Sequence, residues 1–146
     1  EDARPLLLCY GRVGNGKTYL CEALSIAWYK QGYFCRVLTM SEIMQMFKST
    51  MKPESGMLPF EMVLDNLRRA RRLIIDDVGM GGSGSAWEYG QLEDIVVYRY
   101  RERLPTVMTT NRDLTELPER IVSRFYDPDI GCVVLNDAPD YRRRKT

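Results

Sequence analysis

Short apolar runs alternate along the chain with longer stretches in which apolar residues recur every three or four positions. Such runs suit strands that are buried on both faces of a sheet. Five strands are therefore predicted, at residues 6–10, 34–40, 73–76, 105–109 and 132–135.

The helical spacing is clearest at residues 17–31, where Leu20, Leu24 and Trp28 share one face and Gly32 ends the helix. Four further helices are predicted. The first begins with a cap at Ser41 and reaches about Thr50, and the second ends near Ala70. The third begins at the capping box of Ser85 and Glu88 and reaches Arg103, and the fourth follows Pro118. Strands that alternate with helices predict an α/β fold with a five-stranded parallel sheet flanked by helices.

Composition is that of an ordinary globular protein. The chain has 146 residues, of which 45% are hydrophobic and 28% charged, and we expect a single domain over residues 1–146. No apolar run is long enough to cross a bilayer, and no charged and then apolar leader precedes Leu6. An excised cytoplasmic domain with no membrane partner is therefore expected.

Charge and the missing histidine narrow the chemistry. The chain has 21 Lys and Arg against 20 Asp and Glu, so its net charge is +1 and a polyanion must be bound by a local arrangement of groups. It contains no His, which excludes Ser-His-Asp triads, Cys-His pairs and zinc sites with His ligands. The four cysteines form no CxxC pair, and buried, reduced thiols are expected.

Residues 11–18 read GRVGNGKT and match the phosphate-binding pattern GxxxxGK[ST], between a predicted strand and a predicted helix. The glycines let backbone N–H groups approach phosphate oxygens, and the helix directs its positive end at them. Lys17 supplies a cation for the β- and γ-phosphates, and the Thr18 hydroxyl can ligate Mg²⁺. A nucleoside triphosphate is expected here, held by Gly11, Val13, Gly14, Asn15, Gly16, Lys17, Thr18 and Tyr19.

Polar residues at the ends of two later strands complete this prediction. Asp76 and Asp77 end an apolar strand, so Asp76 would hold Mg²⁺ through water and Asp77 would polarise the attacking water. Asp77 is shorter than the Glu usual at this place, which predicts slow hydrolysis. Asn111 follows another strand, and its amide can reach the γ-phosphate only if that strand lies between the other two.

Arginines supply the remaining candidates. Arg120 and Arg124 lie four residues apart on one helix face, and Arg124 is the better candidate to reach the γ-phosphate of a neighbouring subunit. That role implies self-assembly into a ring or spiral. Arg142 either returns to the nucleotide of its own subunit or belongs to a disordered basic tail.

A basic cluster precedes the Asp-Asp strand at Arg68, Arg69, Arg71 and Arg72. It either grips nucleic-acid phosphates or forms a solvated helix end near the negative end of the helix dipole. Lys48 and Lys52, near Phe47 and Phe60, would extend a basic surface.

Several segments together resemble one family. They are GRVGNGKTYLCEA, LIIDDVG, the Ser-x-Trp opening of a helix, VVYRYRERLPTVMTTN, ERIVSRF and DYR. In this order they are similar to the AAA+ domain of DnaC-type replicative helicase loaders, in the DnaC/IstB-like group, from Leu6 to Arg142. Asn111 matches the family's sensor 1 position, Arg124 its arginine finger and Arg142 its sensor 2 arginine.

The resemblance implies a P-loop NTPase of the AAA+ class, from a bacterium or phage, that uses ATP and Mg²⁺ to deliver a replicative hexameric helicase onto single-stranded DNA. It also implies a helical lid that is absent or much reduced, and the family's separate N-terminal helicase-docking domain is not expected within these residues. Three alternatives stay open: an IstB-like transposition helper ATPase that binds duplex DNA, a protein-binding nucleotide switch with no DNA role, and a small-molecule kinase.

Overall fold

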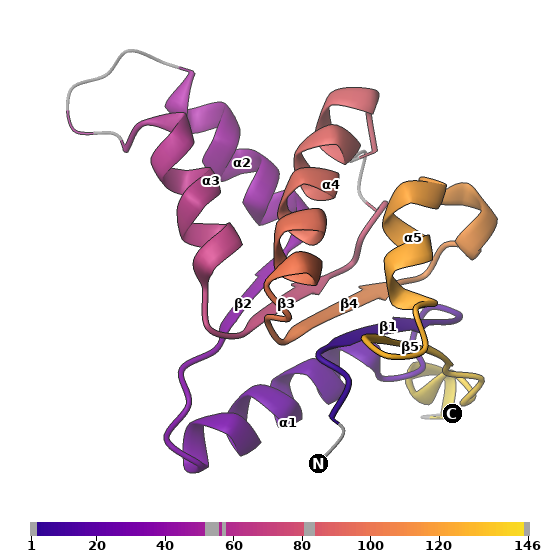
Figure 1. Cartoon of the computed structure of the whole chain (residues 1–146). Helices are drawn as coiled ribbons and strands as arrows, with labels where there is room; N and C mark the ends of the chain where they lie inside the picture. Colours follow the sequence, from indigo (N-terminus) through magenta and orange to yellow (C-terminus); the bar gives the residue numbers. More distant parts are fainter. Residues whose placement is uncertain (1–2, 52–55, 57, 81–83, 145–146) are drawn as a thin grey trace.

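The structure is a computed structural model that describes residues 3–51, 56, 58–80 and 84–144. Its five strands are parallel and lie in the order β2-β3-β4-β1-β5 (Figure 1). The strands are β1 (Leu6–Tyr10), β2 (Arg36–Thr39), β3 (Leu73–Asp76), β4 (Thr106–Thr110) and β5 (Gly131–Leu135). The predicted α/β fold with a five-stranded parallel sheet is confirmed.

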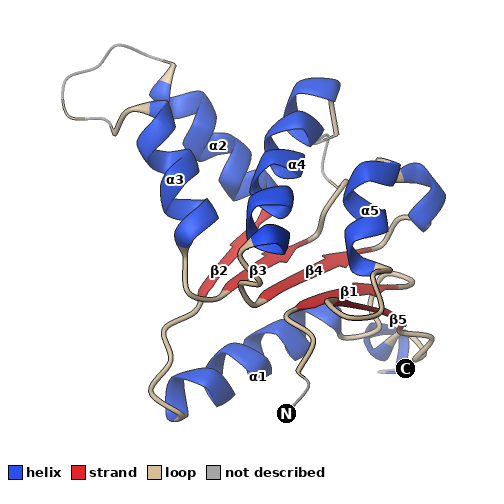
Figure 2. Ribbon diagram, in the orientation of Figure 1, coloured by secondary structure: helices blue, strands red, loops and turns tan. Residues whose placement is uncertain are grey.

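Helices cover both faces of the sheet (Figure 2). They are α1 (Lys17–Lys30), α2 (Met40–Thr50), α3 (Phe60–Arg69), α4 (Ala86–Arg101) and α5 (Glu119–Phe125), with 3₁₀ turns at Leu114–Glu116 and Tyr141–Arg144. Helix α1 lies alone on one face, and the other four α-helices lie on the opposite face. The larger hydrophobic core lies beneath those four helices, and a smaller one, around Cys21, Ile74 and Val107, lies beneath α1.

The second strand and the helix after it differ from the sequence prediction. Strand β2 begins at Arg36 rather than at residue 34, and helix α2 is capped by Thr39, so the prediction of a cap at Ser41 is wrong. The Thr39 hydroxyl accepts a hydrogen bond from the Glu42 N–H at 3.1 Å, and the Glu42 carboxylate accepts one from the Thr39 N–H at 2.7 Å. This reciprocal capping box starts the helix at Met40 and leaves Ser41 inside the first turn.

The predicted capping box of α4 is confirmed. Glu88 donates its N–H to the Ser85 hydroxyl at 3.2 Å, and its carboxylate accepts from the N–H groups of Ser85 at 3.0 Å and Gly84 at 2.7 Å. Lys48 of α2 adds an ion pair at 3.0 Å. Burial alone would raise the pKa of Glu88, but these donors outweigh it and lower the pKa to about 2.

Replacing Glu88 with Ala is expected to lower the free energy of unfolding by about 1–2 kcal/mol at pH 7, because two helix-start N–H groups lose their acceptor. Since the pKa of Glu88 is depressed, its contribution is present above pH 4.5 and lost as the pH falls toward 2. Urea denaturation of the natural chain and the Glu88→Ala variant across this pH range should give free energies of unfolding that converge in acid. Glu61→Ala, at an exposed position in the first turn of α3, should change stability by less than about 0.5 kcal/mol.

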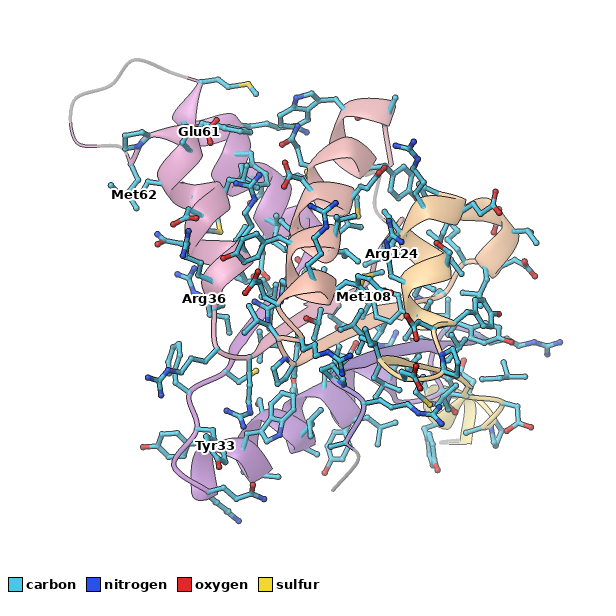
Figure 3. The ribbon with its side chains drawn as sticks, viewed as in Figure 1. Tyr33, Arg36, Glu61, Met62, Met108 and Arg124 are labelled. Atoms are coloured by element: carbon cyan, nitrogen blue, oxygen red, sulfur yellow. The ribbon has the colours of Figure 1, made fainter. Side chains whose placement is uncertain are left out.

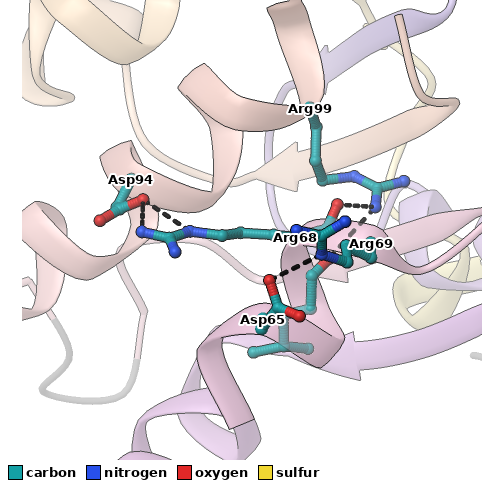
Figure 4. Close-up of polar contacts among 6 residues, drawn as sticks. Asp65, Arg68, Arg69, Asp94 and Arg99 are labelled. Atoms are coloured by element: carbon teal, nitrogen blue, oxygen red, sulfur yellow. Dashed lines mark hydrogen bonds and ion pairs between the residues drawn. The ribbon is translucent and has the colours of Figure 1, made fainter. Parts of the chain in front are cut away.

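Arg99 of α4 is fully buried and ties three segments together, and Figure 4 shows its bonds to the end of α3. Its guanidinium donates to the backbone carbonyls of residues at the end of α3, to Pro105 just before β4 and to Thr106, the first residue of β4. The acceptors are the Leu67 carbonyl at 3.1 Å, Arg68 carbonyl at 3.0 Å, Ala70 carbonyl at 2.6 Å, Pro105 carbonyl at 2.7 Å and Thr106 hydroxyl at 2.7 Å. Burial lowers the pKa of Arg99 to about 10, so it stays protonated at pH 7.

Three arginines of the predicted basic cluster have partners within the chain. Arg68 pairs with Asp94 of α4, and Arg69 with Asp65 at 2.8 Å (Figure 4). The Arg72 guanidinium lies over the Tyr33 ring at 3.6 Å, and Arg71 is exposed. Arg68 and Arg69 occupy the last turn of α3, as the helix-end interpretation predicts.

Of the basic surface expected near Phe47 and Phe60, the structure describes Lys48 and the two aromatic rings. Lys48 pairs with Glu88, and Phe47 is fully buried against Phe60 at 4.9 Å between ring centroids, so Phe47 is not available to stack on a base. Lys52 lies outside the described residues. Nucleic-acid contact by this region stays a prediction.

Candidate nucleotide-binding site

The loop between β1 and α1 forms a cradle at the carboxyl edge of the sheet. Gly14 and Gly16 have φ of +80° and +89°, in the left-handed region that favours glycine, and Gly16 caps α1. A Cβ on Gly14 would collide with the Asp140 carboxylate. The loop opens onto a cavity of about 880 Å³ that Val13 and Tyr19 also line.

Lys17 is buried at the floor of this cradle, with 5% of its surface exposed. Its ammonium donates to the carbonyl oxygens of Gly11 at 2.8 Å and Arg12 at 2.7 Å, and to the Asn15 side-chain oxygen at 2.9 Å. Burial lowers the pKa of Lys17. A cation held beside a helix N-terminus is the arrangement that binds phosphate. Gly11 thus holds the Lys17 ammonium through its carbonyl oxygen.

Thr18 and Asp76 are brought together by the pairing of sequence-distant elements. The Thr18 hydroxyl donates to the Asp76 carboxylate at 2.7 Å, and the Thr109 hydroxyl donates to the other carboxylate oxygen. Asp76 is 4% exposed. Among the described residues no cluster of three or more Cys, Asp or Glu could hold a metal by itself. The pair fits Mg²⁺, which takes one or two protein ligands and completes its shell with phosphate and water.

Asp77 and Asn111 line the cavity from two neighbouring strand ends. The Asp77 N–H donates to the Thr109 hydroxyl at 3.1 Å, and its φ of +55° turns the chain sharply after β3. Burial, and then the neighbouring Asp76, raise the pKa of Asp77, while Lys17 and Arg142 oppose the rise. Strand β4, which Asn111 follows, lies between β3 and β1, the order that its predicted role requires.

The chain after β5 closes over the cradle. The Asn15 side chain donates to the Asn136 carbonyl at 2.6 Å, and the Asn136 side chain donates back to the Asn15 carbonyl at 3.2 Å. The Tyr141 N–H donates to the Gly14 carbonyl at 3.1 Å, and Arg142 lines the cavity. Of the two alternatives for Arg142, the structure favours its return to the site of its own chain.

Sequence reasoning missed three cavity residues in this closing segment: Asn136, Ala138 and Tyr141. Asn136 had a usable signal, because it directly follows the last strand and polar residues at parallel strand ends share one edge of the sheet.

The structure does not bring Arg120 and Arg124 to this cavity. Arg120 pairs with Glu93 of α4 at 3.3 Å. Arg124 points from α5 toward α4, where its guanidinium lies over the Tyr100 ring at 5.1 Å (Figure 3). A contact of Arg124 with the phosphates in this cavity would therefore have to come from a second copy of the chain.

If Asp77 has its predicted role in the hydrolysis of a nucleoside triphosphate, replacing it with Glu is expected to raise the single-turnover rate of that hydrolysis by about tenfold, because the longer side chain would bring its carboxylate nearer to the attacking water. Quench-flow with excess protein measures this step. Asp137→Glu, at an exposed position outside the cavity lining, is the matched control. A variant at position 77 that is slower than the natural chain would contradict the prediction.

A phosphate cradle with acidic and amide groups at adjacent ends of a β2-β3-β4-β1-β5 sheet defines an ATP-binding domain with the AAA+ fold. The chain belongs to the family of IstB-like ATP binding proteins, whose profile matches residues 1–135. No match was found among curated protein sequences.

Solved structures bear out the fold. The DnaC helicase loader is 23% identical, with a TM-score of 0.75, over 93% of this chain and 80% of its own. DnaI is 24% identical, with a TM-score of 0.70, over 96% of this chain and 73% of its own. AMPPCP-bound DnaA from Aquifex aeolicus is 23% identical, with a TM-score of 0.73, over 96% of this chain, which spans only 42% of that protein.

No helix among the described residues has the length and apolar character needed to cross a membrane.

Proposed function

We propose that the chain is a Mg²⁺-dependent, slowly hydrolysing ATPase domain that acts as a nucleotide-dependent switch in loading a replicative hexameric helicase onto single-stranded DNA. One observation supports the nucleotide-dependent switch: Lys17, Asp77 and Asn111 converge on one cavity, whereas Arg124 lies outside it. A site divided in this way depends on assembly, because Arg124 reaches the phosphates only from a neighbouring copy of the chain. The helicase-loading role is supported by the sequence resemblance and by the fold shared with the DnaC helicase loader.

The residues of the site have different roles in binding and hydrolysis. Loop N–H groups and the Lys17 ammonium hold the β- and γ-phosphates, and Arg142 approaches from the closing segment. Thr18 and Asp76 would hold Mg²⁺, which neutralises phosphate charge when it is bound with the nucleotide. Asp77 accepts a hydrogen bond from the attacking water and Asn111 donates to the γ-phosphate, so the two groups orient the water and the phosphate for in-line attack.

A transposition helper that binds duplex DNA is the second candidate, and membership of the IstB-like family favours it. Both candidates need the same nucleotide site. They differ in the form of DNA that the ATP-bound assembly prefers.

Fluorescence anisotropy with one labelled oligonucleotide, single-stranded or duplex, tests the proposal in the presence of an ATP analogue or ADP. We expect tighter binding to the single strand with the analogue only, and loss of this effect in Lys17→Ala. A preference for the duplex would move the assignment to the transposition helper. Binding to neither form would leave a protein-binding nucleotide switch and contradict both DNA roles.

A further inference from the structure

Helix α4 carries an Arg-Tyr pair, Arg99 and Tyr100, and the buried contacts described above are those of Arg99. Arg99 points into the core, whereas Tyr100, the next residue, faces α5. The Tyr100 hydroxyl donates to the Asp127 carboxylate, and the face of its ring lies 5.1 Å from the guanidinium carbon of Arg124. Tyr100 therefore touches both Arg124 and the turn that follows α5.

Arg124 is held without a carboxylate partner. Among the described residues it forms no ion pair, whereas Arg120 on the same helix pairs with Glu93. Its Nε atom is buried and has no hydrogen-bond partner in the described part of the chain. The contact with the Tyr100 ring restrains the guanidinium but leaves its charge available to an anion from outside.

The far end of Tyr100 is also fixed. One carboxylate oxygen of Asp127 accepts from the Asp129 N–H at 3.0 Å, and the Asp127 carbonyl accepts from the Gly131 N–H at 2.7 Å. These bonds make a tight turn between α5 and β5. The other carboxylate oxygen of Asp127 accepts from Tyr100, and among the described residues Asp127 forms no ion pair with Arg124.

We propose that Tyr100 is a positioning residue that holds the Arg124 side chain uncompensated between α4 and α5, where the γ-phosphate bound by a neighbouring copy of the chain can meet it. This inference rests on the proposed function, since it requires Arg124 to act in trans.

The test is ATP hydrolysis per chain, measured over a range of chain concentrations with saturating ATP and Mg²⁺. Arg124→Ala should abolish the rise of the rate with concentration. Tyr100→Leu should lower the plateau rate by about two- to tenfold and leave the KM for ATP and the concentration at half-plateau unchanged. Tyr100→Phe, which keeps the ring, should retain more of the rate than Tyr100→Leu.

Tyr98→Leu is the matched control, because Tyr98 lies on the same helix with the Arg69 guanidinium 5.7 Å from its ring. It should leave the plateau unchanged. If Tyr100→Leu shows no cooperative unfolding transition, Tyr100→Met replaces it, since the flexible Met side chain fills irregular gaps.

The coupling between Tyr100 and Arg124 decides whether Tyr100 acts through Arg124. In the Arg124→Ala background, Tyr100→Leu should have no further effect on the rate. An equal additional loss there, or a Tyr100→Leu plateau equal to that of the natural chain, would overturn the inference and leave the trans role of Arg124 intact. An unchanged plateau in Arg124→Ala would instead overturn the divided site of the proposed function, and the role of Tyr100 with it.

Discussion

Lys17→Ala is expected to lower the rate of ATP hydrolysis by about a hundred- to a thousandfold, the usual effect of removing one preorganised donor from a site of developing charge. The Lys17 ammonium is buried and is held by the carbonyl oxygens of Gly11 and Arg12. Among the described residues that line the cavity there is no other lysine that could replace it.

Steady-state phosphate release and binding of a fluorescent ATP analogue measure this effect. Lys30→Ala removes an exposed lysine at the other end of α1 and should change neither quantity. A Lys17→Ala chain that kept more than about a tenth of the natural rate would show that the cradle acts without its cation.

Arg99→Leu is expected to lower the free energy of unfolding by about 3–5 kcal/mol, because several buried oxygens would lose their donor together. Arg99 supplies the hydrogen bonds that join the end of α3 to the start of β4. Such a loss is a large part of the stability of a domain of this size. Arg99→Lys should recover only a fraction of it, since one ammonium cannot span the positions of a planar fork.

Urea denaturation at pH 7 measures the loss. Arg101→Leu, at an exposed position on the same helix, should lie within about 0.5 kcal/mol of the natural chain. A similar change for the two variants would mean that neighbouring groups, or water, satisfy the oxygens around position 99.

The strands were predictable because burial on both faces leaves an apolar run that can be read locally. All five predicted strands overlap observed ones, and β1, β3 and the loop after β1 lie where the sequence predicts them. The cap of α2 was misplaced because Thr39 and Ser41 are both good N-cap residues, and only the bonds between Thr39 and Glu42 distinguish them.

The position of Asn111 was predictable for a different reason. A role for its amide at the γ-phosphate required its strand to lie between those of the P-loop and Asp76, and β4 occupies that position. Parallel strands place their carboxyl ends at one edge, so a correct strand order is enough to bring such residues close together. The catalytic roles of Asp77, Asn111 and Arg124 stay predictions, and the Asp77→Glu and Arg124→Ala variants test two of them.

The sequence by itself determined the class of fold and the phosphate cradle, because apolar periodicity and glycine-dependent loop geometry depend on neighbouring residues. The tertiary structure alone decided that Asn136 and Tyr141 close over the cradle, that Arg99 is buried, and that Arg124 rests on Tyr100. Those contacts join residues far apart in the chain, as Asn15 and Asn136 are. The sequence alone does not show whether an arginine is solvated, paired or buried, because only its packed neighbours distinguish these states.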